Sequence, residues 1–206
     1  MGILDANQRA RLRAAVERAE ADTSGEFVTV LASAADSYPY IPTLWAALIA
    51  LLLPVPAVYA GLDWEQAYML QVAVFFVLAS LFRWEPIKMC LIPAAVKRRR
   101  AYRLAREQFT NLGLHLTPRR AGVLLFVSAA ERYVEILADQ GIAEKVDNTR
   151  WQGVIDEFVA AVRAGNIAVG MERGVERCAA LMTEAFPPES NQVDLLPNHL
   201  VEIGPD

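Results

Sequence analysis

The sequence contains little cysteine and little histidine, with two of each among its 206 residues. Cys90 and Cys178 lie far apart, which excludes a disulfide framework and the ligand spacing of a structural metal site. We expect both to be reduced thiols that pack as small apolar side chains. His115 falls in a predicted loop and His199 in a polar C-terminal stretch. Neither gives a nucleophile the adjacent base that covalent catalysis needs.

The sequence also lacks an excess of positive charge. Its 20 Lys and Arg residues are outnumbered by 24 Asp and Glu residues, which gives a net charge of −4. This balance argues against nucleic acid as the main partner. Residues 1–22 are polar and amphipathic and lack the apolar core of a secretory signal peptide. Gly122 and Gly141 stand alone, so the sequence has no glycine-rich loop of the kind that cradles phosphate.

Charge is missing altogether from two long runs. Residues 37–62 are 26 consecutive uncharged residues, and residues 66–82 are a further 17. A helix needs about 20 apolar residues, and not fewer than about 17, to cross the hydrocarbon core of a bilayer. The two runs therefore predict a transmembrane helical hairpin over residues 40–83. Pro54 and Pro56 predict a kink at the end of its first span.

The flanks of the predicted hairpin are basic and its turn is acidic. Eight Lys and Arg residues and one acid, Glu85, lie from Arg83 to Arg106, whereas the turn carries Asp63 and Glu65. Because Lys and Arg accumulate on the cytoplasmic side, we predict two spans in the inner (plasma) membrane, with both termini and the soluble domain in the cytoplasm. Neither span has an ionisable residue at its centre, which favours an anchor over a channel or a transporter.

The remaining sequence predicts one globular domain that the hairpin interrupts. Residues 1–36 combine an amphipathic helix over 5–22 with a strand over 26–32. Residues 84–96 follow the hairpin and are too short for a third span, so we expect them to lie at the membrane interface. The domain then resumes over residues 97–186.

This second part contains the rest of the expected sheet. The expected elements are a basic helix over 97–112, strands over 121–128 and 132–138, and two helices whose apolar stripes start at Trp151 and Ile167. The short connection between the two strands predicts an antiparallel hairpin. One helix and one strand cannot form a core, so the strand at 26–32 must pair with them. The result is an α/β fold, a small mixed sheet covered by helices, followed by an extended or loosely ordered polar tail at 187–206.

This order of elements resembles the TPM domain family, which is named for thylakoid, photosystem-associated and nematode receptor-accessory proteins. The matching segments are Gly122–Val127, Glu131-Arg132, Val134–Ile136, Asp139–Ile142, Gln152–Phe158 and Gly165–Gly170. The resemblance covers roughly 1–35 and 97–186, with the hairpin inserted after the first strand, as in a bacterial membrane-bound branch. Glu131 replaces the family's Asp, and Asp139 replaces the first Gly of its Gly-x-Gly. The resemblance implies a calcium-binding domain, a phosphatase, or an accessory factor in the assembly and repair of membrane complexes.

The candidate site consists of carboxylates at the ends of the expected strands. Glu26 begins the first strand, Glu131 lies in the turn of the β-hairpin, and Asp139 ends the third strand. Hard oxygen ligands from three elements would suit Ca²⁺ or Mg²⁺. The alternative is that all three are ordinary surface carboxylates. We expect Arg132 to form an ion pair with Asp139 or Glu26.

Three functions are compatible with these features. The first is a membrane-anchored, non-enzymatic binding or accessory module for a membrane protein, with a divalent cation as an additional ligand. The second is a metal-dependent, phosphatase-like hydrolase at the membrane that uses the three carboxylates. The third is a homo-oligomer whose hairpins line a channel, which small residues such as Ala73 permit but the uncharged spans disfavour.

Overall fold

A computed structural model describes residues 4–117, 119–188 and 200–204 of the chain. The chain divides into two compact units. Residues 1–35 and 99–206 form the first unit, and residues 36–98 form the second. The first unit is a mixed α/β domain, and the second is helical.

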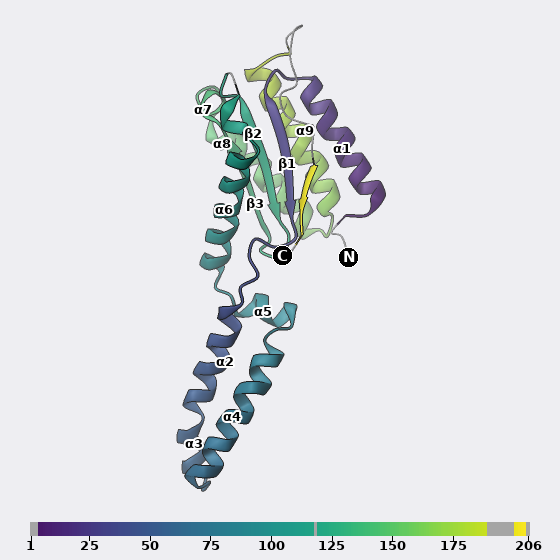
Figure 1. Ribbon diagram of the computed structural model, residues 1–206. Coiled ribbons are helices and arrows are strands. Elements are labelled where there is room, and N and C mark those ends of the chain that lie inside the picture. The colour runs from purple at the N-terminus through teal and green to yellow at the C-terminus, as the bar shows by residue number, and fades with distance from the viewer. Residues whose placement is uncertain (1–3, 118, 189–199, 205–206) are drawn as a thin grey trace. The chain divides into compact units, whose positions relative to one another are not determined.

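The described part of the first unit contains a four-stranded sheet with the order β3-β2-β1-β4 (Figure 1). Strand β1 (Glu26–Ala32) lies parallel to β2 (Gly122–Ser128), with Glu26 opposite Gly122 and Ala32 opposite Ser128. Strand β3 (Tyr133–Ala138) runs antiparallel to β2, as its short connection predicts. The mixed sheet expected from the sequence is therefore confirmed. All residues of β1 and β2 are buried, because both strands are covered on both faces.

The fourth strand of the sheet was not predicted from the sequence, which indicated only an extended or loosely ordered tail. Leu200–Ile203 form β4, which pairs in parallel with β1. Leu200 is buried in the core on one face of the sheet, and Val201 packs on the other face. Four residues, of which only Glu202 is polar, were too short a signal within a polar, proline-containing stretch. The tail residues 189–199, which include His199, and 205–206 lie outside the described residues.

Helices cover the two faces of the sheet unequally (Figure 1). Helices α1 (Ala6–Ala21), α8 (Asn148–Arg163) and α9 (Ile167–Ala185) form the larger core with one face. Helix α6 (Ala94–Asn111) and the short 3-10 helix η1 (Leu114–Leu116) cover the other. The four-residue helix α7 (Gln140–Ala143) follows β3.

Local signals in the sequence fix the ends of the covering helices. Asp5 caps α1 by accepting a hydrogen bond from the Gln8 backbone N–H at 2.7 Å, and the Gln8 side chain accepts one from the Asp5 N–H at 2.9 Å. Asp147 caps α8 through the Thr149 N–H. Arg150 on α8 makes two hydrogen bonds, of 3.0 and 2.7 Å, to the Glu184 carboxylate on α9. These bonds lower the pKa of Glu184.

The second unit is a helical hairpin with short helices at its turn and its end. It contains α2 (Tyr40–Leu52), α3 (Pro54–Tyr59), α4 (Trp64–Leu81) and α5 (Glu85–Leu91). The helix break between α2 and α3 falls at Pro54, where the Leu53 N–H bonds to the Ala50 carbonyl instead of the carbonyl one residue earlier. The expected segment 84–96 contains α5, which the Trp45 indole joins to α2 by donating to the Leu91 carbonyl at 3.1 Å.

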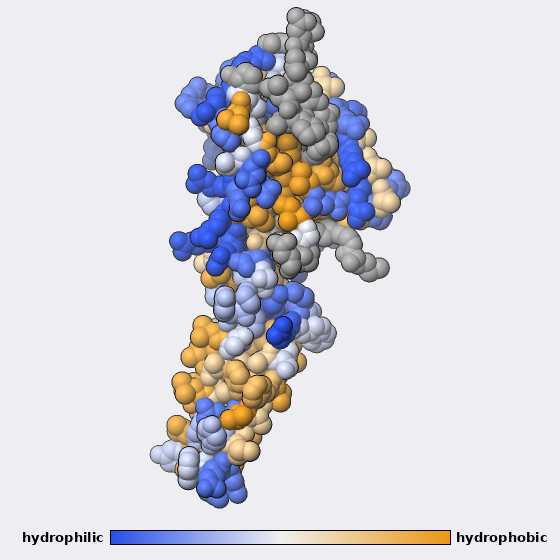
Figure 2. Space-filling view, viewed as in Figure 1, coloured by the Kyte–Doolittle hydropathy of each residue, from blue (hydrophilic) through white to orange (hydrophobic). Residues whose placement is uncertain are grey.

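Small side chains lie between the helices of this unit, and large apolar ones lie outside. Ala46, Ala50 and Ala67 are buried where α2 and α4 pack together. Figure 2 shows apolar side chains over the outer surface of these helices. Exposed examples are Leu44, Leu51, Leu52, Met69, Phe76 and Val77. Among the described residues, Tyr40–Tyr59 and Trp64–Leu81 are long and apolar enough to cross a membrane.

Candidate functional site

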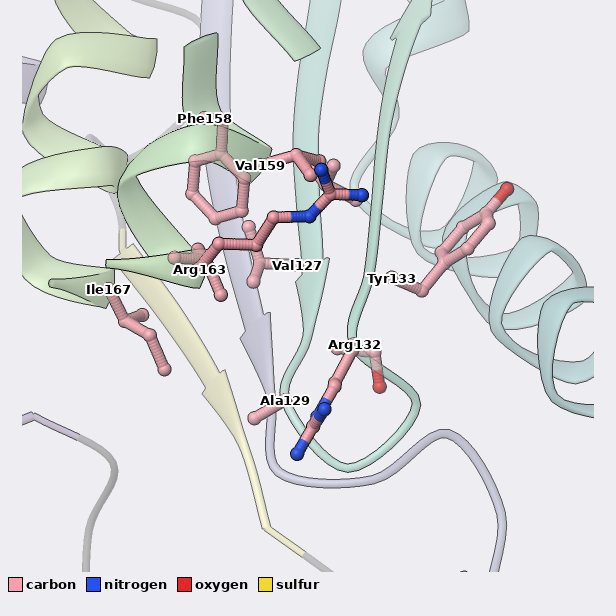
Figure 3. Close-up of a pocket in the computed structure, with 11 residues that line it drawn as sticks. Val127, Ala129, Arg132, Tyr133, Phe158, Val159, Arg163 and Ile167 are labelled. Carbon is pink, nitrogen blue, oxygen red and sulfur yellow. The ribbon is translucent and has the colours of Figure 1, made fainter. Parts of the chain in front are cut away.

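A pocket of about 660 Å³ opens where β2 turns into β3 (Figure 3). One wall is the end of this β-hairpin, and the other is the last turn of α8 with the start of α9. The lining residues are Val127, Ser128, Ala129, Arg132, Tyr133, Val134, Phe158, Val159, Val162, Arg163 and Ile167. The volume is in the range of small-molecule sites, about 300 to 1,000 Å³.

The β-hairpin wall is held in place by backbone hydrogen bonds to the end of the neighbouring strand β1. The backbone N–H groups of Ala129 and Ala130 donate to the carbonyls of Ala32 and Ser33, each at 3.0 Å. Arg132 closes the turn by donating its N–H to the Ala129 carbonyl, and its φ is 52°. These backbone hydrogen bonds hold Arg132 in a left-handed conformation, which is uncommon for a residue with a side chain. They thereby fix the position from which the Arg132 side chain extends.

The helical wall follows from the period of α8. Phe158 and Val162 are four residues apart, as are Val159 and Arg163, so each pair lies on one side of the helix. Phe158 is buried in the larger core, whereas Val159 and Val162 are half-buried beside the pocket. Arg163 is the last residue of α8, which brings its guanidinium to the edge of an otherwise apolar wall.

The pocket is positively charged in a protein whose net charge is −4. Arg132 and Arg163 line it, and the described lining includes no acidic side chain. Both arginines are exposed. Within the described chain, neither guanidinium has a hydrogen-bond or ion-pair partner. Figure 3 shows the two side chains on either side of Val127.

Glu131, a predicted cation ligand, holds the β-hairpin to the end of the first strand. Its Oε2 accepts a hydrogen bond from the Ala35 N–H at 3.0 Å and another, very short, from the Ser128 hydroxyl. Ser128 is fully buried. Side chains alternate along a strand, so the Ser128 hydroxyl lies on the same face as Phe126, away from Val127 and the pocket.

The other two predicted ligands lie at the opposite end of the sheet. Glu26 begins β1, and the N–H of Asp139 bonds to the carbonyl of Gly122, the residue opposite Glu26. Strands β1 and β2 each have seven residues, so Glu131 is separated from these two by roughly 20 Å at about 3.3 Å per residue. The sheet therefore does not bring the three carboxylates together. No group of three His, Cys, Asp or Glu side chains that could hold a metal ion is found among the described residues.

The predicted ion pair of Arg132 with Asp139 or Glu26 is wrong for the same reason, because the sheet separates Arg132 from both. Arg120 takes that place, with its Nε 3.3 Å from Oδ2 of Asp139. Oδ2 accepts no hydrogen bond, so the contact is an ion pair only. Oδ1 of Asp139 instead caps α7 by accepting from the Gln140 N–H at 2.8 Å.

Two residues of this arrangement, Arg163 and Arg120, were not predicted from the sequence. Arg163 could have been found from its position four residues after Val159, at the end of a stripe already assigned to the core. Arg120 has a φ of 54°, which turns the chain just before β2, and no sequence pattern predicts that conformation for an arginine. Both cysteines are free thiols. Cys178 is buried, as expected, whereas Cys90 is exposed, so the expectation that both pack as small apolar side chains is wrong for Cys90.

Comparisons with known proteins found a family model that matches part of the chain and a solved structure of similar fold. The family model described as the TPM domain matches residues 87–181. The solved NMR structure of the BA42 protein from the psychrophilic bacterium Bizionia argentinensis aligns with a TM-score of 0.61. That alignment covers 98% of this chain and 96% of that chain at 18% sequence identity, which shows likeness of fold alone. No curated protein matches the chain.

Proposed function

We propose that this chain is a membrane-anchored TPM protein whose domain acts as a non-enzymatic binding or accessory module for membrane proteins, on the support of the TPM domain match over residues 87–181. In this proposal α2 with α3 forms the first span and α4 the second. The domain and both termini face the cytoplasm, and the membrane is the inner (plasma) membrane. A second copy of the chain is a further candidate partner within the bilayer.

The observation that carries the anchor is the exposed apolar surface of the second unit. Leu52 is 71% exposed and Met69 is 68% exposed, on helices whose small residues face each other. A soluble protein rarely leaves an apolar surface of this extent in water. In lipid the same arrangement is favourable, because small residues let the two helices approach and large ones contact acyl chains.

The distribution of charge supports the proposed orientation. The turn between α3 and α4 carries Asp63, whereas Lys97 and Arg98–Arg100 lie in the first turns of α6, just after the second unit's last short helix. Positive residues near the ends of spans stay in the cytoplasm. In the same position they also attract the anionic lipids of the cytoplasmic leaflet.

The non-enzymatic part of the proposal is supported by the geometry near the pocket. The Ser128 hydroxyl, which donates to the Glu131 carboxylate, is buried on the face of the sheet away from the pocket. A substrate in the pocket would not reach that hydroxyl. The hydrolase alternative therefore has less support, and binding of Ca²⁺ or Mg²⁺ stays an untested prediction of the sequence.

The natural cysteines make the topology testable in the full chain. Cys178 is buried, so a membrane-impermeant maleimide should not label it while the domain is folded. We would replace Cys90 by serine and introduce one exposed cysteine at a time, as Asp63→Cys in the turn or Gln152→Cys on α8. Intact spheroplasts should label the Asp63→Cys protein, and only lysed spheroplasts should label the Gln152→Cys protein.

The same samples test the anchor itself. Alkaline carbonate should leave the protein in the membrane pellet, because spanning helices resist extraction that removes surface-bound proteins. Release into the supernatant would reject the anchor, and labelling of Gln152→Cys in intact spheroplasts would reject the orientation. Photo-crosslinkers placed on the exposed face of α8 should then capture a membrane protein in a stoichiometric complex. Normal assembly of membrane complexes in a deletion strain would reject the accessory role.

A further inference from the structure

We propose that the pocket between the β2–β3 turn and the α8–α9 corner binds a small amphipathic oxyanion, a carboxylate or phosphate head group on an apolar body. This ligand class goes beyond the anchoring proposed above and does not depend on whether α2 and α4 cross a membrane. The pocket belongs wholly to the first unit.

The charge of the pocket selects an anion. Arg132 and Arg163 enter it from different elements, and neither is neutralised within the described chain. Two like charges on one cavity repel each other, and a bound oxyanion removes that repulsion. A guanidinium presents a planar set of donors that matches the oxygens of a carboxylate or a phosphate. Lysine would supply the charge without this geometry.

The floor of the pocket selects an apolar body. Val127 and Val134 on the strands line the pocket together with Val159, Val162 and Ile167 on the helices, and the buried Phe158 belongs to the same apolar core. A free inorganic anion would leave these side chains in contact with water. A ligand with an alkyl or aromatic body would bury them and would gain about 25 cal/mol for each Å² of apolar surface removed from water.

The shape and size of the pocket favour a small molecule over a protein segment. Its volume of about 660 Å³ suits one drug-sized ligand. Its charged groups are the two arginine side chains on either side of Val127, each of which can hold a head group whose apolar body lies on the valines between them. A peptide bound along a sheet edge would instead use a row of backbone groups.

Binding would be tested on the full chain in nanodiscs of zwitterionic lipid, with octanoate and octyl phosphate as probes. Ligand-observed NMR would measure the dissociation constants, and empty nanodiscs would correct for partition into lipid. Two controls separate the two halves of the proposal: octanol has the tail without the charge, and acetate has the charge without the tail. We expect both controls to bind at least about tenfold more weakly, because octanol loses the charge-assisted hydrogen bonds and acetate loses the burial of apolar surface.

Variants connect the binding to the pocket. Arg132→Ala and Arg163→Ala should each weaken binding about tenfold, whereas Arg163→Lys should keep part of it. Arg173→Ala is the matched control, because Arg173 is an exposed arginine on α9 outside the pocket. Val162→Trp should block the cavity while both arginines remain. Thermal unfolding of each variant would identify any that fails to fold.

Each possible result either supports or overturns the proposed binding of an amphipathic oxyanion. Tighter binding of octanoate would identify a carboxylate ligand, and tighter binding of octyl phosphate a phosphate ligand, and either supports the proposal. Equal binding of octanol and octanoate would overturn it, because the arginines would then have no role. Binding unchanged in folded Arg132→Ala and Arg163→Ala proteins would also overturn it. The topology experiment has a separate readout, so failure of the anchor would leave this result unaffected.

Discussion

Glu131 accepts a hydrogen bond from the backbone N–H of Ala35, 96 residues earlier in the chain, at 3.0 Å. The same carboxylate oxygen accepts from the buried hydroxyl of Ser128. Ala35 is the last residue of the first unit before the helical hairpin begins. This carboxylate therefore joins the exit of β1 to the turn that carries Arg132, which gives it a structural role.

Glu131→Ala should lower the free energy of unfolding by about 1–3 kcal/mol, because it leaves the Ser128 hydroxyl and the Ala35 N–H without an acceptor. Glu131→Gln should cost less, since its amide oxygen still accepts one bond. Chemical denaturation monitored by tryptophan fluorescence would measure both. A Glu131→Ala protein as stable as the wild type would contradict the role of this carboxylate as a link.

Asp139 should matter for stability through its cap on α7. Asp139→Ala should destabilise the domain by about 0.5–2 kcal/mol, the usual cost of losing an N-cap side chain. Asp139→Asn should cost less, because an amide oxygen can still accept from the Gln140 N–H. Arg120→Ala should have a small effect, since that side chain is 55% exposed and its ion pair is screened by water.

The same site predicts the response to divalent cations. Glu131 lies at the other end of the sheet, and both oxygens of Asp139 already face protein donors. We therefore expect Ca²⁺, Mg²⁺ and EDTA to leave the midpoint of thermal unfolding unchanged. A native-state ligand at a hundredfold excess over its dissociation constant would stabilise by about 2.7 kcal/mol, so binding would be detected easily. A cation-specific rise that is lost in Asp139→Asn would restore the predicted metal site.

Two glycines should respond to alanine in opposite ways. A Cβ at Gly122 would overlap the backbone carbonyl of Leu114, so Gly122→Ala should destabilise the domain by about 1–3 kcal/mol through a forced backbone shift. At Gly153, inside α8, a Cβ meets nothing within 4 Å. Gly153→Ala should stabilise by about 0.5–1 kcal/mol, because alanine loses less backbone entropy in a helix. Similar effects at both positions would contradict this packing.

Burial of Cys178 predicts a pH dependence. Burial raises the pKa of the Cys178 thiol above its ordinary value. In the unfolded chain the thiol ionises above about pH 8.5, so the folded state then binds more protons than the unfolded state. Stability is therefore lost as pH rises, by up to about 1.4 kcal/mol per pH unit from this group. Cys178→Ala should make the decline between pH 9 and 11 shallower by up to that amount, whereas Cys90→Ser should leave it unchanged. Equal slopes in all three proteins would show that the thiol is not buried.

The sequence alone determined the elements whose signals are local. The two charge-free runs identified the apolar helices, and Pro54 marked their interruption. The uninterrupted apolar run before Ser128 indicated a strand buried on both faces, and its short connection to the next strand indicated an antiparallel pair. Each of these features depends on neighbouring residues, so periodicity and turn chemistry were sufficient.

The tertiary structure alone decided which residues meet. The direction of each strand placed Glu131 at one end of the sheet and both Glu26 and Asp139 at the other, so three carboxylates that looked convergent in the sequence are apart. Pairing across the sheet also gave β4 its place, since Leu200 becomes buried only when β1 lies beside it. Arg132 and Arg163 share a pocket because the end of a β-hairpin packs against the end of a helix. Such a contact between residues distant in the chain depends on the packing of whole elements, and no local pattern in the sequence encodes it.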